Sequence, residues 1–240
     1  VYKRQQLNVT MGSMGTITFA KAAGTNVNAI DDVTPKVAEE AWDGAAGSVL
    51  QGIGSSTNSG AVAYKSPSFD LMGVSASFGV DYDPAAGGAG NDHDAVATKA
   101  SDVGSGMGAV VKLSHDSGLT LGAGIEEVSS NSNASAESEN VTGYALYTMG
   151  PVSVGYQAYY LDNGTAPTGG KSPTADYSGD AVGIAFNVND QVSIGYQKIS
   201  EDKEAYTSTA GVTRDIKSVS AAYSSGGMTM SIQQTDTDNY

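Results

Sequence analysis

The chain has 240 residues, with 12 Lys and Arg against 26 Asp and Glu, and a formal net charge of −14 at pH 7. This balance excludes nucleic-acid binding through phosphate contacts, which needs clustered Lys and Arg. Cysteine is absent and histidine occurs twice, so disulfide frameworks and thiol chemistry are excluded, and little material remains for zinc sites or histidine-based catalysis. No run approaches the ~18 apolar residues of a membrane-spanning helix.

The two ends of the sequence predict a fragment of a longer coding region. Residues 1–5, VYKRQ, can be written in codons that resemble a transposon end sequence used in preparing sequencing libraries, although a genuine, slightly basic N-terminus fits them too. We therefore expect 1–5 to be an adapter-derived artefact without ordered contacts, and 6–240 to form a single domain. The other end, QQTDTDNY, stops in polar sequence with no closing strand.

Tight turns separate the predicted strands in chain order. LNVTM and TITFA flank GSMG (12–15), and AVAY and a strand over 71–82 flank SPSFD (66–70). Similar clusters of Gly, Asn, Asp, Ser and Pro follow at 115–118, 148–151, 187–190 and 224–227. These six hairpins predict about twelve antiparallel strands. Much longer connections alternate with the turns, at 22–58, 83–107, 129–140, 163–179 and 201–215.

Apolar and polar residues alternate along the predicted strands, so successive side chains point to opposite faces. The expected apolar face carries Met72, Val74, Phe78, Val154, Ile194 and Ile232. The expected polar face carries Ser75, Ser77, Gly155, Gln157 and Gln197. No stretch keeps a 3.6-residue apolar stripe with caps, so long helices are not expected.

A soluble β-sandwich alternates in the same way, so three other features decide between the two architectures. Several predicted strands reach ten residues, whereas soluble strands average about 5–6 and about 9–11 tilted residues cross a bilayer. The polar face consists of Ser, Gly, Thr and Gln rather than Lys and Glu, as in a wet barrel interior. Tyrosines recur toward the ends of the apolar faces, where membrane barrels carry aromatic girdles. The pattern favours an all-β transmembrane antiparallel barrel.

One stretch, NSGAVAYKSPSFDLMGVSASFGVDY, resembles the segment of Gram-negative general porins that follows their constriction loop. The matching positions are Asn58, Ser59, Tyr64, Ser66, Pro67 and Phe69. GTITFAK (15–21) is similar to the family strand that leads into that loop, with Ala20 where the family usually has Gly. The resemblance extends over about 6–235, and its sharp motif covers 58–69.

The resemblance implies a passive, water-filled channel in the bacterial outer membrane that passes small hydrophilic solutes and ions. It further implies a roughly sixteen-stranded barrel, of which the first three strands and the last are missing here. The resemblance also implies a homotrimer surrounded by outer-membrane lipid, and it implies that the protein catalyses no reaction. The homotrimer follows from the resemblance alone and is not visible in the composition or the periodicity.

The resemblance also places the constriction loop at 22–58. Candidate constriction residues are Asp31, Asp32, Lys36, Glu39, Glu40 and Asp43. Five carboxylates against one lysine predict a cation preference, because charged rings in a narrow passage select ions. The candidates for the facing pore wall are Lys65, Lys112, Glu126 and Gln157. The alternatives left open are an acidic surface loop for 22–58 and a position at the rim for the wall residues.

Two other functions are weighed against the channel. GGAGND (87–92) matches the start of a calcium-binding nonapeptide, which suggests a secreted acidic β-rich adhesin or calcium-binding β-roll. However, the motif occurs once, and a β-roll buries its face only by stacking repeats. An enzyme-bearing barrel needs a Ser/His/Asp or Asp/His set, which two scattered histidines do not provide. No cofactor is expected, and calcium binding by the acidic loop is left open.

Overall fold

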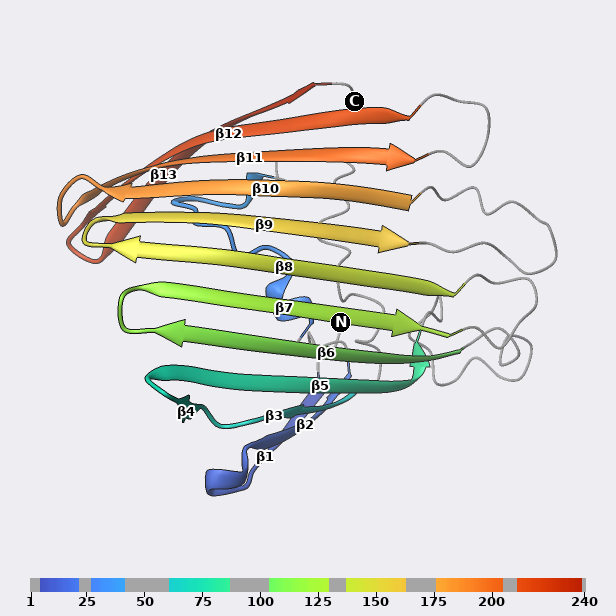
Figure 1. Cartoon of the computed structure of the whole chain (residues 1–240). Helices are drawn as coiled ribbons and strands as arrows, with labels where there is room; N and C mark the ends of the chain where they lie inside the picture. Colours follow the sequence, from blue (N-terminus) through green and yellow to red (C-terminus); the bar gives the residue numbers. More distant parts are fainter. Residues whose placement is uncertain are drawn as a thin grey trace.

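The computed structural model of the chain describes residues 5–21, 27–41, 61–86, 104–129, 137–162, 176–204 and 211–238. Within these ranges thirteen β-strands form one antiparallel sheet, with two short 3-10 helices (Figure 1). No helix in these ranges has the length and apolar character needed to cross a membrane. The expected all-β antiparallel architecture is confirmed.

The N-terminal part of the sheet contains five strands. They are β1 (Gln5–Thr10), β2 (Thr16–Lys21), β3 (Val62–Lys65), β4 (Phe69–Leu71) and β5 (Val74–Ala86). The β1–β2 turn holds a 3-10 helix, η1 (Gly12–Met14), and the Tyr64 hydroxyl donates a hydrogen bond to the Met14 carbonyl at 2.8 Å. Gly15, with φ of 92°, has the left-handed backbone that glycine adopts most readily.

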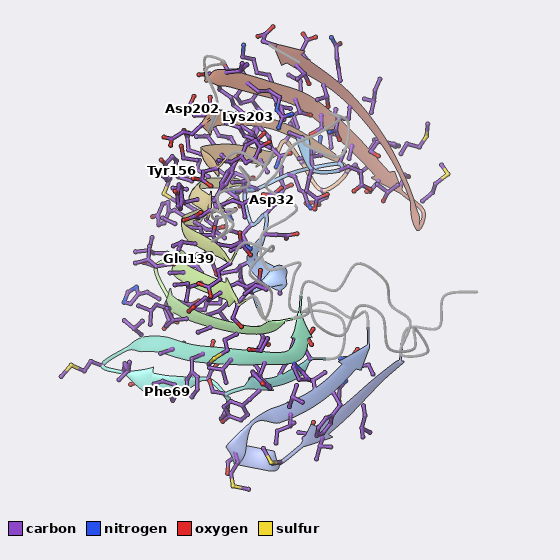
Figure 2. The ribbon with its side chains drawn as sticks, turned by 90° about the vertical axis from the view of Figure 1, so that its right-hand side faces the viewer. Asp32, Phe69, Glu139, Tyr156, Asp202 and Lys203 are labelled. Carbon is purple, nitrogen blue, oxygen red and sulfur yellow. The ribbon has the colours of Figure 1, made fainter. Side chains whose placement is uncertain are left out.

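The remaining eight strands are long and follow one another as hairpins. They are β6 (Gly104–His115), β7 (Leu119–Val128), β8 (Ser138–Met149), β9 (Val152–Asp162), β10 (Asp176–Asn187), β11 (Val192–Glu204), β12 (Val212–Ser225) and β13 (Met228–Asp238). Each strand pairs with its neighbour in sequence, except that β3 pairs directly with β5 and β4 lies beside β5. The sheet curves into an open arc whose edge strands are β1 and β13 (Figures 1 and 2).

Three details differ from the sequence expectations. The SPSFD segment contains an additional strand, β4, so thirteen strands are present rather than twelve. The strands also run further than alternation indicated, with β5 ending at Ala86 and β11 at Glu204. The backbone ladder continues there although the alternation has ended, through Pro84 and two alanines in β5 and through charged residues in β11, and hydropathy does not detect such extensions. Finally, Gln5 begins β1 and pairs with Lys21, against the expectation that 1–5 make no ordered contact; residues 1–4 lie outside the described ranges.

The two faces of the sheet are confirmed for all but one of the assigned residues. Phe78, Val154, Ile194 and Ile232 are exposed on the convex face, whereas Gln157 and Gln197 are buried on the concave face. Figure 2 shows Tyr156 on the convex side of the arc and Asp32 on the concave side. Met72 is the exception, because it lies in the β4–β5 turn with φ of 56°.

The apolar band on the convex face runs obliquely across the strands. Residues that are register partners on successive strands form rows across the sheet. One such row begins at Leu121 of β7 and Ala145 of β8, continues through Val182 of β10, and ends at the charged Lys217 of β12 and Asp236 of β13. The apolar residues of β13 lie nearer the turns, at Met228, Met230 and Ile232. A band of constant depth crosses strands in this way when they are tilted. Strands of membrane barrels are tilted in this way, by about 35–45°.

Candidate functional site

A continuous segment, 27–41, crosses the concave face of the sheet and is the centre of the candidate site. It begins at Val27, whose backbone N–H donates to Asp81 Oδ2 on β5 at 3.3 Å. It continues through the 3-10 helix η2 (Asn28–Ile30) and reaches β13 at Glu39 and Glu40. In Figure 2 the segment lies inside the arc, where Asp32 is labelled. We call it the inner segment.

Gln157 of β9 makes the densest set of contacts to the inner segment. Its Oε1 accepts the Val33 N–H at 3.1 Å, and its Nε2 donates to the carbonyls of Ile30 and Asp31 at 2.9 and 3.0 Å. Nε2 also contacts Thr142 Oγ1 of β8 at 2.8 Å. The side chain is completely buried. Gln157 therefore fixes the backbone of the inner segment to the wall and is covered by it.

Two further glutamines hold the segment where it crosses the later strands. Gln197 of β11 donates from Nε2 to Thr34 Oγ1 at 3.0 Å. Gln233 of β13 accepts the Glu39 N–H at 3.0 Å and donates to the Glu40 carbonyl at 3.3 Å. Gln233 satisfies two backbone groups of the irregular segment, and Gln197 satisfies the hydroxyl of Thr34. The segment is therefore anchored at three places along its length.

Glycines on the wall let the inner segment lie close to the strands. A Cβ atom added to Gly155 would meet Pro35 Cδ at 2.5 Å, and one added to Gly195 would meet Val37 Cγ2 at 2.9 Å. Real Cβ atoms essentially never come within 3.0 Å of such atoms. Cβ atoms would likewise come within 3.0 Å of the segment at Gly108, Gly124 and Gly183. A side chain at these positions would force the segment, or the side chains that it presents to the wall, to shift.

Two adjacent carboxylates, Asp31 and Asp32, lie in the middle of the inner segment. Asp31 Oδ1 accepts the Asp32 N–H at 2.8 Å, and Asp32 Oδ1 accepts the Thr34 N–H and hydroxyl at 2.9 and 2.8 Å. Burial raises the pKa of Asp31 to about 6; the Asp32 N–H opposes this shift and the Asp32 charge adds to it. The segment therefore carries one carboxyl group that titrates close to neutral pH.

The other predicted constriction residues have different surroundings. Lys36 forms an ion pair with Glu40, four residues later, and Glu39 is exposed. Within 27–41, four carboxylates and one lysine give 1 − 4 = −3 formal charges. Asp43 lies outside the described residues. No group of three or more His, Asp or Glu side chains suited to a metal ion occurs among the residues that are described.

The predicted wall residues divide into two pairs. Lys65 and Lys112 line a cavity beside the inner segment. Glu126 and Gln157 also lie on the concave face but are completely buried, and Glu126 Oε2 accepts a hydrogen bond from Asn140 Nδ2 at 2.7 Å. Glu126 therefore joins two strands of the wall, and Gln157 joins the wall to the segment; both are covered rather than facing the open lumen.

Sequence reasoning missed a buried polar cluster on the same wall. Tyr159 donates from its hydroxyl to Glu201 Oε1 at 2.8 Å, and Arg214 Nε donates to Glu201 Oε2 at 3.0 Å. Glu201 and Tyr159 are almost fully buried, and Gly179 leaves the space that the tyrosine ring occupies. The three side chains come from β9, β11 and β12, so only the strand register brings them together.

The described sheet is similar to solved outer-membrane structures. A loop L8 deletion mutant of OmpT, an outer membrane protein of Vibrio cholerae, matches with a TM-score of 0.64 and 14% identity over 98% of this chain and 74% of that one. A porin refined at 1.8 Å resolution matches with a TM-score of 0.59 and 14% identity over 95% and 73% of the two chains. A trimer form of OmpT, folded in vitro, gives 0.61 and 13% over 94% and 67%. At these identities the likeness shows the fold.

No curated protein sequence matches the chain. The GGAGND motif lies outside the described residues, and the antiparallel pairing of every described strand differs from a β-roll built of stacked parallel repeats. The family model described as Gram-negative porin matches residues 4–239, nearly the whole chain. The chain therefore belongs to the Gram-negative porin family and is a β-barrel channel protein of the bacterial outer membrane.

Proposed function

We propose that this porin is a water-filled channel for the passive diffusion of small hydrophilic solutes and ions, that it catalyses no reaction, and that the inner segment is its constriction. The observation that supports this proposal best is the anchoring of the segment to the concave wall through Gln157, Gln197 and Gln233. A segment held in this way narrows the lumen permanently, so it limits the size of the solutes that pass.

The channel prefers cations. The inner segment has a net formal charge of 1 − 4 = −3, and the lysine it contains is paired with Glu40. Carboxylates in a narrow passage with low-dielectric walls attract cations and repel anions. Asp31, Asp32 and Glu39 are the residues that create this field.

The working form is a homotrimer embedded in outer-membrane lipid. The trimer form of OmpT supports the assembly, and the oblique apolar band on the convex face supports contact with lipid. A band that follows the tilt of the strands keeps apolar side chains at bilayer depth around the arc.

Planar-bilayer recordings of the purified full-length protein test the proposal. The reversal potential in a potassium chloride gradient should have the sign of a cation-preferring pore and should shift toward zero in the triple variant Asp31→Asn, Asp32→Asn and Glu39→Gln. The variant Glu139→Gln removes one charge from the convex face and should leave the potential unchanged. Absence of ion-conducting channels would refute the channel proposal. An unchanged potential in the triple variant would refute the role of the inner segment.

A further inference from the structure

A cavity of about 450 Å³ lies between the inner segment and the wall formed by β3 to β8. Ala29, Ile30 and Val33 border it from the segment, and Lys65 and Lys112 border it from the wall. Its volume falls in the range of small-molecule sites, about 300–1,000 Å³. No Asp or Glu among the described residues lines it, although acidic residues outnumber basic ones 26 to 12 in the chain. The cavity therefore has a local charge opposite to that of the chain.

Hydrogen-bond donors that have no partner among the described residues line this cavity. Lys112 and Tyr144 lie in one row of paired residues with Gly122 between them. A Cβ on Gly122 would lie 2.5 Å from the Tyr144 hydroxyl oxygen, so the glycine leaves the ring its place. Tyr144 is 7% exposed, and its hydroxyl makes no hydrogen bond to any residue that the structure describes. The hydroxyl oxygen is not one of the fully buried atoms that lack a partner, so it is accessible from the cavity and can donate to a ligand there.

The two lysines that line the cavity can bind a ligand for the same reason. Neither Lys65 nor Lys112 forms an ion pair with a described residue; the ion pairs among these residues involve Lys36, Lys198, Arg214 and Lys217. Ser77 pairs in register with Lys112 and adds a hydroxyl beside it on the concave face. Two ammonium groups and two hydroxyls thus face one cavity from β3, β5, β6 and β8.

We propose that this cavity binds a small oxyanion, a phosphate or carboxylate group whose oxygens accept hydrogen bonds from Lys65, Lys112, Ser77 and Tyr144. Lysine is a common ligand of phosphate oxygens, and hydrogen bonds to charged acceptors are the strong ones. The described lining contains no carboxylate, which is the group that would repel such a ligand. We name this site the oxyanion pocket. Because both lysines are exposed, the affinity is weak, as suits a solute in transit.

The effect of the oxyanion pocket on permeation rests on the proposed function, whereas binding itself does not. An anion that enters the cavity beside the acidic inner segment gains two compensating positive charges. The pore therefore retains small phosphorylated or carboxylated solutes for longer than neutral solutes of the same size.

Isothermal titration calorimetry on the detergent-solubilised full-length protein tests the binding at constant ionic strength in sodium chloride. Inorganic phosphate, glucose 6-phosphate and acetate serve as separate titrants and distinguish free phosphate, a phosphate ester and a carboxylate. The double variant Lys65→Gln and Lys112→Gln should lose at least about tenfold in affinity, and Tyr144→Phe should lose severalfold while keeping the ring packed on Gly122. The control Lys217→Gln removes a positive charge from the convex face, away from the cavity.

Saturable binding that is lost in the double variant and kept in Lys217→Gln supports the pocket. No saturable binding with any of the three titrants, or an equal loss in Lys217→Gln, overturns it. Circular dichroism shows whether a variant is folded. If the double lysine variant fails to fold, the affinity of Tyr144→Phe tests the pocket instead, because this change removes only the hydroxyl. Phosphate-dependent interruptions of single-channel current measure the effect on permeation separately. Their absence in a protein that binds phosphate would contradict retention in the pore and leave binding established.

Discussion

Gln157 of β9 and Val33 of the inner segment join that segment to the barrel wall. The side-chain oxygen of Gln157 accepts a hydrogen bond from the backbone N–H of Val33 at 3.1 Å. The amide nitrogen of the same side chain donates to two carbonyls of the segment. A single residue of β9 thus satisfies three backbone groups of an irregular segment.

Replacing Gln157 with Leu should loosen the constriction. The change removes four hydrogen bonds and leaves backbone groups of the segment without partners, which costs about 1–3 kcal/mol for each buried group that water cannot reach. We expect larger fluctuations of the open-channel current in single-channel recordings. Gln234→Leu, on the convex face of β13, is the matched control and should leave the current steady.

Replacing Gly155 with Ala should displace the inner segment. The new methyl group would lie 2.5 Å from Pro35 Cδ, so the segment must shift toward the lumen, at a cost of about 1–3 kcal/mol for overpacking. We expect lower single-channel conductance and a lower unfolding temperature in detergent. Gly143→Ala is the control, because its methyl group would meet only a backbone oxygen at 3.8 Å. Equal effects in both variants would contradict the close seating of the segment.

Ion selectivity should depend on pH through Asp31. Because the pKa of Asp31 is about 6, the carboxyl group gains a proton as pH falls from 7 to 5, and the cation preference should decrease over that range. The folded protein holds this proton between pH 3.8 and about 6 while the unfolded chain does not, so the contribution of Asp31 to stability falls as pH rises through this window. Asp31→Asn should abolish this part of the pH dependence of the reversal potential. If the reversal potential of that variant still changed with pH as much as in the unmodified protein, a group other than Asp31 would be responsible.

A charged side chain on the convex face at bilayer depth should destabilise the folded protein. Val154→Arg places a cation among apolar residues of β9 and should cost about 2–4 kcal/mol of folding free energy in lipid bilayers. Ser231→Arg, on the exposed concave face of β13, should cost much less. Folding titrations into vesicles measure both variants, and similar costs would place Val154 away from the lipid.

Alternation and turn chemistry were enough to predict the hairpins, because period-two patterning and Gly/Asn/Asp clusters are local. They placed Val154 and Gln157 on opposite faces correctly. They could not predict β4, which is three residues long, or the polar extension of β11 to Glu204. Contacts across several strands were also out of reach, since the meeting of Tyr159, Glu201 and Arg214 depends on register.

The candidate site was only partly predictable for a related reason. The acidic composition of 22–58 indicated a constriction loop only in combination with the family resemblance. The function of Gln157 in holding that loop, and the close approach of Pro35 to Gly155, depend on where the loop lies against the wall. No periodicity in the sequence encodes this placement, because it results from packing between segments more than a hundred residues apart.

A disulfide cross-link between the inner segment and the wall tests the central claim most directly. A Cβ on Gly195 would lie 3.2 Å from Val37 Cβ, close to the separation of about 3.5–4.5 Å in disulfides, and the chain has no other cysteine to compete. The double variant Val37→Cys and Gly195→Cys should therefore cross-link under mild oxidation and keep an open, ion-conducting pore. The pair Val37→Cys and Gly143→Cys, whose second position lies on the convex face, should not cross-link. Absence of the first cross-link in folded protein, or equal formation of both, would contradict the position of the inner segment inside the barrel.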